Sequence, residues 1–114
     1  MSQPLYPAPS ADIAARRHEL APETDDAFRA FSRQVFAAGA LDEKTKQLIA
    51  VAVAHTTQCP YCIRGHTRAA LRKGAGEPEL MEAIWVAAEM RAGGAYAHSA
   101  LALSAAGDLQ PTGE

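Results

Sequence analysis

Residues 41–66, LDEKTKQLIAVAVAHTTQCPYCIRGH, decide the predicted fold of this chain. The middle of this stretch, Leu48 to Ala54, is apolar at every position, and its alternating alanines favour a helix over a buried strand. Asp42 can cap this helix at its start, and we expect the helix to run to about His55. A helix that is apolar on all sides is normally enclosed by other helices. The stretch therefore predicts a buried helix in an all-α protein.

The residues that follow form a Cys-x-x-Cys-x-x-x-His motif, made of Cys59, Cys62 and His66. Pro60 cannot donate a backbone hydrogen bond, so it belongs in the first turn of a second helix that ends near Lys73. Each helical residue advances by about 100°, which places the three motif side chains within an arc of about 60°. The free N–H groups at the helix start favour a thiolate at Cys59, and His66 can hydrogen bond the Cys62 sulfur or take its proton. The motif predicts a redox-active thiol pair with an adjacent base.

Two other interpretations of the motif remain open from the residues alone. The cysteines could be core residues, although Pro60 and the in-phase His66 would then be coincidental. They could also bind zinc with His66 and a fourth ligand, either His55 or His98. Taken alone, His55 and His98 are more typical of packed or capping histidines than of functional ones.

The same reasoning predicts about six helices and no strand. The first nine residues form an arm rich in proline, and Gly107 to Glu114 form a tail. Phe28, Phe31, Val35 and Phe36 recur at helical spacing and are predicted to face the core. The other expected helices run from a Ser10 cap to about Glu19, from Pro22 to about Gly39, from Pro78 to a break at Gly93-Gly94, and from about Ala95 to Ala106.

Length and composition restrict the class of protein. The chain has 114 residues, which favours a single domain, and its net charge of −2 makes nucleic acid an unlikely partner. It contains 26 alanines but few aromatic residues, so each helix contact buries little area. We therefore expect self-association to complete the core.

The expected location is the cytoplasm, with no membrane association. The longest apolar run is far shorter than the ~20 residues that span a bilayer, and the N-terminus lacks the pattern of a secretory signal. In a reducing compartment, a Cys-x-x-Cys pair is more typical of redox or metal chemistry than of a structural disulfide.

Residues 41–66 together with 74–99, GAGEPELMEAIWVAAEMRAGGAYAHS, resemble the AhpD-like alkylhydroperoxidases of the carboxymuconolactone decarboxylase superfamily. The resemblance covers residues 41–106, which we take as the domain core, after an N-terminal region of arm and two helices over residues 1–40 and before the tail at 107–114. It implies an all-α fold assembled as homo-trimers or homo-hexamers, and thiol-dependent reduction of hydroperoxides without a metal or organic cofactor.

The resemblance also implies roles for the motif residues. Peroxide attacks the second cysteine, here Cys62, while Cys59 donates a proton and then closes the disulfide, and His66 relays protons. A thioredoxin-like or lipoamide-linked donor would reduce the disulfide. The decarboxylase branch lacks the cysteine pair, which argues against lactone decarboxylation here.

The sequence departs from the family pattern at two positions, Gln47 and Tyr61. The family relay often begins with a glutamate at the position of Gln47, and Tyr61 lies where some members have histidine. Gln47 can orient His66 but cannot stabilise an imidazolium by charge. Glu43, Glu82, Glu89 and His98 are other candidates for the missing charge or second base. Two alternative functions therefore remain, a disulfide-exchange or redox-sensing protein with little peroxidase activity, and a small zinc-binding oligomer.

Overall fold

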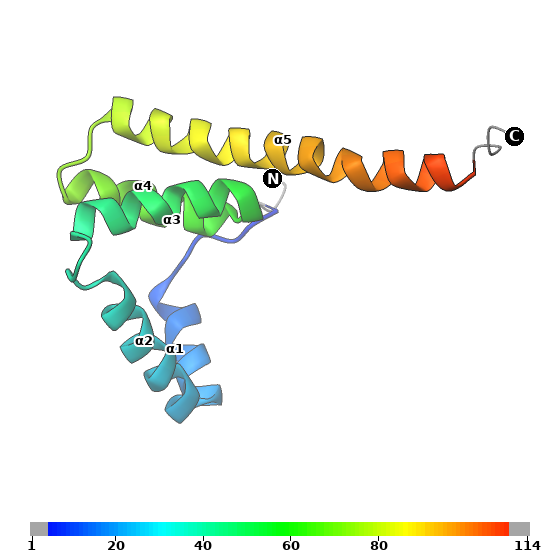
Figure 1. The fold of residues 1–114 in the computed structure, drawn as a ribbon. Helices are drawn as coiled ribbons and strands as arrows, with labels where there is room; N and C mark the ends of the chain where they lie inside the picture. The colour runs from blue at the N-terminus through cyan, green and yellow to red at the C-terminus, as the bar shows by residue number, and fades with distance from the viewer. Residues whose placement is uncertain (1–4, 110–114) are drawn as a thin grey trace, which may run out of the picture. The chain divides into compact units, whose positions relative to one another are not determined.

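The computed structural model describes residues 5–109, and five α-helices without any strand account for most of them. Figure 1 shows the helices in chain order. Their bounds are α1 Ala11–Leu20, α2 Pro22–Phe36, α3 Glu43–Thr57, α4 Pro60–Arg72 and α5 Glu77–Asp108. The all-α prediction is confirmed, and the predicted arm and tail lie partly outside the described residues.

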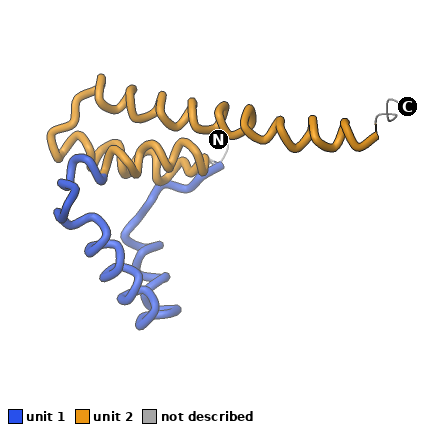
Figure 2. The backbone as a smooth tube through the Cα atoms, in the orientation of Figure 1, with its two compact units in different colours: residues 1–46 blue, residues 47–114 orange. Residues whose placement is uncertain are grey.

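The chain divides into two compact units, residues 1–46 and residues 47–114 (Figure 2). In the first unit, α1 packs against α2. The Ser10 side chain accepts a hydrogen bond from the backbone N–H of Ile13 at 3.2 Å, and Pro22 occupies the first turn of α2. Both helix starts therefore form where the capping signals predicted them.

The second unit holds the small core of the protein. Val51, Ala70, Ala75 and Leu80 are buried together, with Leu48 and Ile84 packed against them. These side chains come from α3, from α4, from the turn that follows α4 and from α5, so the core joins the three helices. Gly74 closes α4 with a φ of 98°, a backbone conformation that glycine adopts without steric cost.

The predicted break at Gly93-Gly94 is wrong, because α5 continues through both glycines to Asp108. A glycine inside a helix costs only about 1 kcal/mol relative to alanine. No proline lies between Pro78 and Asp108, and alanines flank the glycine pair. The predicted fifth and sixth helices are therefore one helix of 32 residues.

The predicted burial of the phenylalanine stripe on α2 is also wrong for this chain taken alone. Phe28 and Phe31 are 65% and 62% exposed, and their rings contact each other at a centroid distance of 6.4 Å. A pair of helices cannot enclose both faces of either member.

The helix α3 is likewise enclosed on one side only, since Val51 is buried whereas Ile49 and Val53 are about half exposed.

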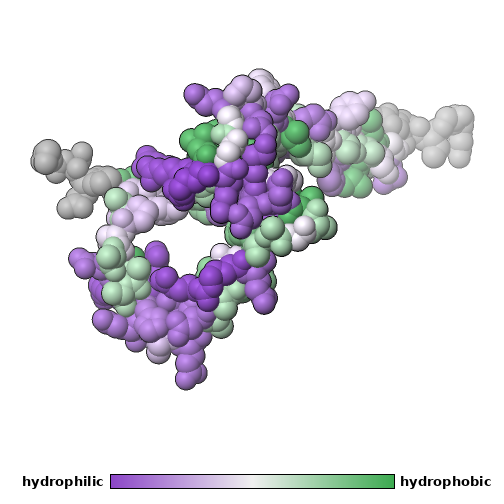
Figure 3. Space-filling model, turned by 90° about the vertical axis from the view of Figure 1, so that its left-hand side faces the viewer, coloured by the Kyte–Doolittle hydropathy of each residue, from purple (hydrophilic) through white to green (hydrophobic). Residues whose placement is uncertain are grey.

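Large apolar side chains also reach the surface of α5, including Trp85, Met90 and Leu103. Figure 3 shows hydrophobic side chains at the molecular surface next to hydrophilic ones. Among residues 5–109, no helix combines the length and the apolar character that crossing a bilayer requires.

Candidate functional site

The candidate site lies at the junction of α3 and α4. After α3 ends at Thr57, Gln58 adopts a left-handed conformation with a φ of 58°, and Cys59 becomes the N-cap of α4. The backbone N–H of Cys59 donates to the carbonyl of Ala54 at 3.1 Å, which fixes the turn. Pro60, in the first helical turn, has no N–H that would need a partner there. The junction therefore places a cysteine side chain over the positive end of a helix.

A hydrogen bond links the two cysteines, whose side chains are free thiols and half-buried. The backbone N–H of Cys62 donates to the Sγ of Cys59 at 3.3 Å. Hydrogen bonds from the Cys62 side chain and from its backbone N–H lower the pKa of Cys59. The same side-chain hydrogen bond, together with burial, raises the pKa of Cys62. Cys59 is therefore the first of the two thiols to ionise.

A second hydrogen bond joins α4 to α3. The Nδ1 of His66 lies 2.7 Å from the Oε1 of Gln47, whose side chain is buried. Because a carbonyl oxygen only accepts, Nδ1 carries the proton and Nε2 is the basic nitrogen of a neutral imidazole. Burial lowers the pKa of His66. The imidazole is thus held neutral and oriented at neutral pH.

The arrangement corrects one detail of the predicted geometry. Cys59 caps α4 from outside the helix, so only Cys62 and His66 are helical residues one turn apart. The cap position brings the Cys59 sulfur to the helix end, where it can accept the N–H of Cys62. Chemically, the site offers a thiol with a lowered pKa, a second thiol and an oriented base, the groups that a dithiol–disulfide cycle requires.

The other sequence candidates lie elsewhere in the hydrogen-bond network. His55 donates from Nδ1 to the carbonyl of Val51 at 2.8 Å, and His98 donates from Nδ1 to the carbonyl of Gly94 at 2.7 Å. Both therefore bond to their own helix. His55 does so in the last turn of α3, which fits the capping interpretation, whereas His98 is exposed inside α5 and is neither packed nor a cap. His98 also lines an open pocket of about 570 Å³ together with Thr56 and residues 90, 91, 94 and 95 of α5.

The acidic candidates do not replace Gln47 as the Nδ1 partner of His66. Glu82 and Glu89 are exposed on α5, and Glu43 is half-buried in the first turn of α3. The partner of the imidazole at Nδ1 is therefore an uncharged amide.

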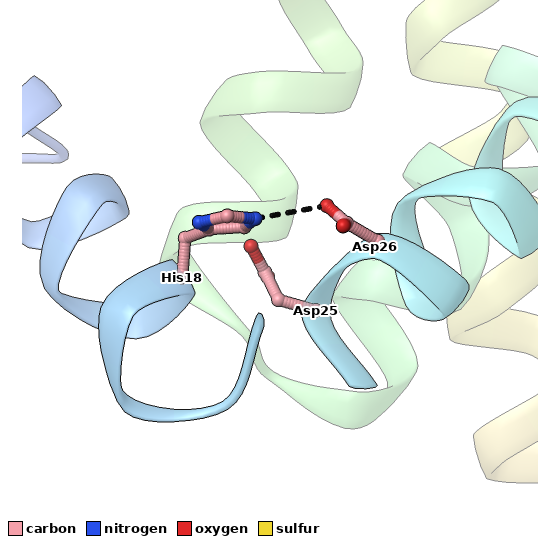
Figure 4. A group of neighbouring side chains, drawn as sticks. All are labelled: His18, Asp25 and Asp26. Atoms are coloured by element: carbon pink, nitrogen blue, oxygen red, sulfur yellow. Dashed lines mark hydrogen bonds and ion pairs between the residues drawn. The ribbon is translucent and has the colours of Figure 1, made fainter. Parts of the chain in front are cut away.

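A separate cluster, which the sequence did not reveal, lies between α1 and α2. The Nε2 of His18 and the Oδ1 of Asp26 are 3.1 Å apart, and Asp25 lies beside them (Figure 4). Asp25 is also paired with Arg29 at 3.1 Å. The acids lie near the N-terminus of α2, where the helix dipole favours negative charge, and the histidine lies in the last turn of α1. We assign the cluster to the stability of the helix pair.

In the described part of the chain, His18, Asp25 and Asp26 are the only group of three or more histidine, cysteine, aspartate or glutamate residues whose ligand atoms all lie within 4.8 Å of one another. Cys59, Cys62 and His66 do not form such a group. Their spacing gives no support to the zinc interpretation of the motif.

Comparison with known proteins identifies the family. The model of the carboxymuconolactone decarboxylase family matches residues 22–105. This chain belongs to that family. Over 80 residues it is 69% identical to a Paracoccus denitrificans protein named uncharacterized protein 4 in cox locus, a match that covers 70% of this chain and 72% of the relative. An uncharacterized Haemophilus influenzae protein is 40% identical over 84 residues, covering 74% of each chain.

Solved structures of similar proteins agree with the fold. A crystal structure of a Methanobacterium thermoautotrophicum protein is 40% identical and has a TM-score of 0.69, covering 73% of this chain and 93% of that one. The apo structure of a carboxymuconolactone decarboxylase family protein from Legionella pneumophila is 37% identical with a TM-score of 0.64, covering 67% and 68% of the two chains. The AhpD-like proteins that the motif resembles lie within this superfamily.

Proposed function

We propose that this member of the carboxymuconolactone decarboxylase family is a thiol peroxidase that needs no metal or organic cofactor and cycles between a Cys59–Cys62 dithiol and disulfide. The observation that carries the proposal is the coupling of the two cysteines at the start of α4, where Cys62 donates to the Cys59 sulfur. The neutral imidazole of His66, oriented by Gln47, supplies the base.

The proposed cycle begins with the thiolate on Cys59, where the hydrogen bonds favour it. Transfer of the Cys62 proton to Cys59, directly or through Nε2 of His66, produces a Cys62 thiolate. This thiolate attacks one oxygen of a hydroperoxide and breaks the O–O bond. The proton on Cys59 then passes to the departing alkoxide or hydroxide, leaving a Cys62 sulfenic acid and an alcohol or water.

The second step closes the disulfide. The Cys59 thiolate attacks the sulfenic sulfur of Cys62, and the S–O bond breaks to release hydroxide. The hydroxide takes up from solvent the proton that Cys59 released when it first ionised, and leaves as water. Two thiols and one hydroperoxide thus yield one disulfide, one alcohol and one water. A thioredoxin-like or lipoamide-linked dithiol would return the pair to its reduced form.

Mass spectrometry after one equivalent of a hydroperoxide tests this proposal. We expect the alkylatable thiols to fall from two to none in each chain, with a loss of about two mass units and a Cys59–Cys62 cross-link in the peptide map. Two thiols that remain freely alkylated would exclude the peroxidase function.

A second function, disulfide exchange with little peroxidase activity, is favoured by one observation. The thiol with the lowered pKa is Cys59 at the helix cap, as in Cys-x-x-Cys exchange proteins, rather than Cys62. Catalytic reduction of insulin disulfides together with negligible peroxide consumption would select this alternative.

We also propose that the protein works as a homo-oligomer, either a trimer or a hexamer. The support comes from the exposed apolar residues of α2, α3 and α5, and from the absence of charge between Arg91 and Asp108. A helix with so few polar residues needs a partner surface. Light scattering should give a mass at least three times that of the chain, and a well-folded monomer at micromolar concentration would contradict the proposal. The cytoplasmic location remains a prediction.

A further inference from the structure

The outer face of α4 carries three arginines in one row. Arg64, Arg68 and Arg72 follow each other at intervals of four residues, so their side chains lie within an arc of about 80° along about 12 Å of the helix. All three are exposed. Around the helix axis, Arg64 and Arg68 lie about 160° and Arg72 about 120° from His66, so the row lies on the side away from His66 and α3.

The charges of this row are not balanced locally. The stretch from Lys44 to Gly76 contains six lysines and arginines and no aspartate or glutamate. The ion pairs His18–Asp26 and Arg29–Asp25 do not involve the row, and within the described residues none of the three arginines has an acidic partner within 4 Å. The chain as a whole is slightly acidic, with a net charge of −2, which makes the positive face a local feature.

Helix stability does not account for the row. Like charges four residues apart destabilise an isolated helix by about 0.2–0.5 kcal/mol for each pair. The helix dipole favours only Arg72, which lies in the last turn, because its effect falls off within the terminal turns. A ligand with negative charge would offset this repulsion.

We propose that the row formed by Arg64, Arg68 and Arg72 docks an acidic protein that carries the dithiol reducing the Cys59–Cys62 disulfide. This inference rests on the proposed redox cycle. The row begins about one turn from the cap that holds Cys59, so a partner bound along α4 can reach the disulfide at the helix end. Clustered charge of one sign raises the association rate of an oppositely charged partner by about 10- to 1,000-fold.

The reaction at this surface is thiol–disulfide exchange. One thiolate of the partner attacks one sulfur of the Cys59–Cys62 disulfide and expels the other sulfur as a thiolate, which gives a mixed disulfide. The second thiol of the partner, as a thiolate, then attacks its own sulfur in the mixed disulfide and releases the second cysteine. Two electrons pass to this protein, and the partner ends as a disulfide.

The experiment measures how fast two model reductants reduce the oxidised protein. The disulfide is formed with diamide, so the measurement does not depend on reaction with peroxide. The probes are two synthetic Cys-x-x-Cys peptides of equal length, one flanked by aspartates and one by lysines, with dithiothreitol as a small reductant. At low salt we expect the acidic peptide to react about ten-fold faster than the basic one, and the difference to disappear in about 0.5 M salt.

Variants locate the effect on α4. Replacement of Arg64, Arg68 and Arg72 by glutamine should abolish the preference for the acidic peptide but leave the dithiothreitol rate unchanged, whereas replacement by lysine should keep the preference. The matched control replaces three arginines of the first unit, Arg16, Arg17 and Arg33, by glutamine and should also keep it.

Three results would overturn the inference. Two of them concern the wild type: equal rates for the two peptides, and rates that do not depend on salt. Neither measurement requires a variant to fold. The third is an α4 glutamine variant that retains the preference. Binding of a single-stranded oligonucleotide through the α4 arginines, without any peptide preference, would assign the face to nucleic acid instead. Failure of the peroxidase proposal has a different signature, because hydroperoxide would then form no disulfide while the diamide-oxidised protein would still discriminate between the peptides.

Discussion

The hydrogen bond between Gln47 and His66 makes Gln47→Glu the most informative substitution in this protein. It replaces an amide oxygen 2.7 Å from Nδ1 of His66 by a carboxylate oxygen of the same shape. At present burial lowers the pKa of His66, and no charge at position 47 opposes this effect. The substitution therefore changes the charge of the relay with little change in packing.

The size of the effect follows from the distance. Two unit charges about 4 Å apart interact by about 4 kcal/mol at an effective dielectric constant of about 20. Desolvation of the new carboxylate at this buried position reduces the gain, so we expect the usual increase of about one to three units in the pKa of His66. The imidazole then becomes protonated near neutral pH and stabilises a thiolate at Cys62. We predict a rise of about ten-fold in the rate of reaction with peroxide at neutral pH.

The assay is the single-turnover reaction of the reduced protein with hydrogen peroxide, followed by loss of alkylatable thiol from about pH 5 to about pH 9. An NMR titration of the His66 ring measures the pKa shift directly. Gln47→Ala, which removes the partner of Nδ1, should react more slowly than wild type. Gln34→Glu on α2 adds the same charge at an exposed position of the other unit and should leave the rate unchanged.

Equal rates for wild type, Gln47→Glu and Gln47→Ala would refute the reasoning, since position 47 would then lie outside the relay. A raised His66 pKa without a change in rate would show that His66 is not the base for Cys62. The stability of Gln47→Glu gives an independent check. A His66 pKa above its unfolded value of about 6.5 adds stability that is complete below that pH and is lost as the pH rises through the folded pKa.

Three further predictions concern other residues of the site and the fold. After treatment with peroxide, Cys59→Ser should accumulate a sulfenic acid at Cys62 that a dimedone probe labels, whereas Cys62→Ser should remain unlabelled; the opposite pattern would exchange the two roles. Because burial lowers the His66 pKa below 6.5, the unfolded state binds the proton more readily than the folded state. The urea midpoint of unfolding should therefore fall as the pH drops from about 6.5 through the folded pKa. His66→Gln should remove this loss of stability. Gly94→Ala should stabilise the protein by about 1 kcal/mol, because the position lies inside a helix and a Cβ there meets open space. Gly74→Ala should destabilise it by about 1–2 kcal/mol, because the φ of 98° is unfavourable for alanine. Thermal melts that reverse these signs would contradict the continuous α5 or the left-handed turn.

Local signals in the sequence determine where most helices begin. Asp42 accepts the backbone N–H of Thr45 at 2.7 Å, Ser10 caps α1, and Pro22 and Pro60 lie in the first turns of their helices. Each of these interactions joins atoms only a few residues apart, so spacing alone predicts them. For the same reason, the sequence placed Cys59 and Cys62 together at the start of one helix.

The continuity of α5 and the exposure of the α2 stripe could not be predicted in this way. Whether Gly93 and Gly94 end a helix depends on small differences in backbone free energy that the rest of the chain decides. Whether Phe28 and Phe31 are buried depends on how many helices are available to cover them. The periodicity of apolar residues in one helix does not predict that number. Both errors arise where the outcome depends on the whole assembly of helices.

The candidate site shows the same division. The sequence identified Cys59, Cys62 and His66 as neighbours on the chain, and the resemblance to AhpD-like proteins singled out Gln47 on another helix. Only the tertiary structure gives the 2.7 Å hydrogen bond between Gln47 and His66 and the burial that lowers the histidine pKa. It alone shows that the pKa of Cys59 is lowered and that of Cys62 raised, because the pKa of each thiol depends on which sulfur accepts the hydrogen bonds and which is more buried.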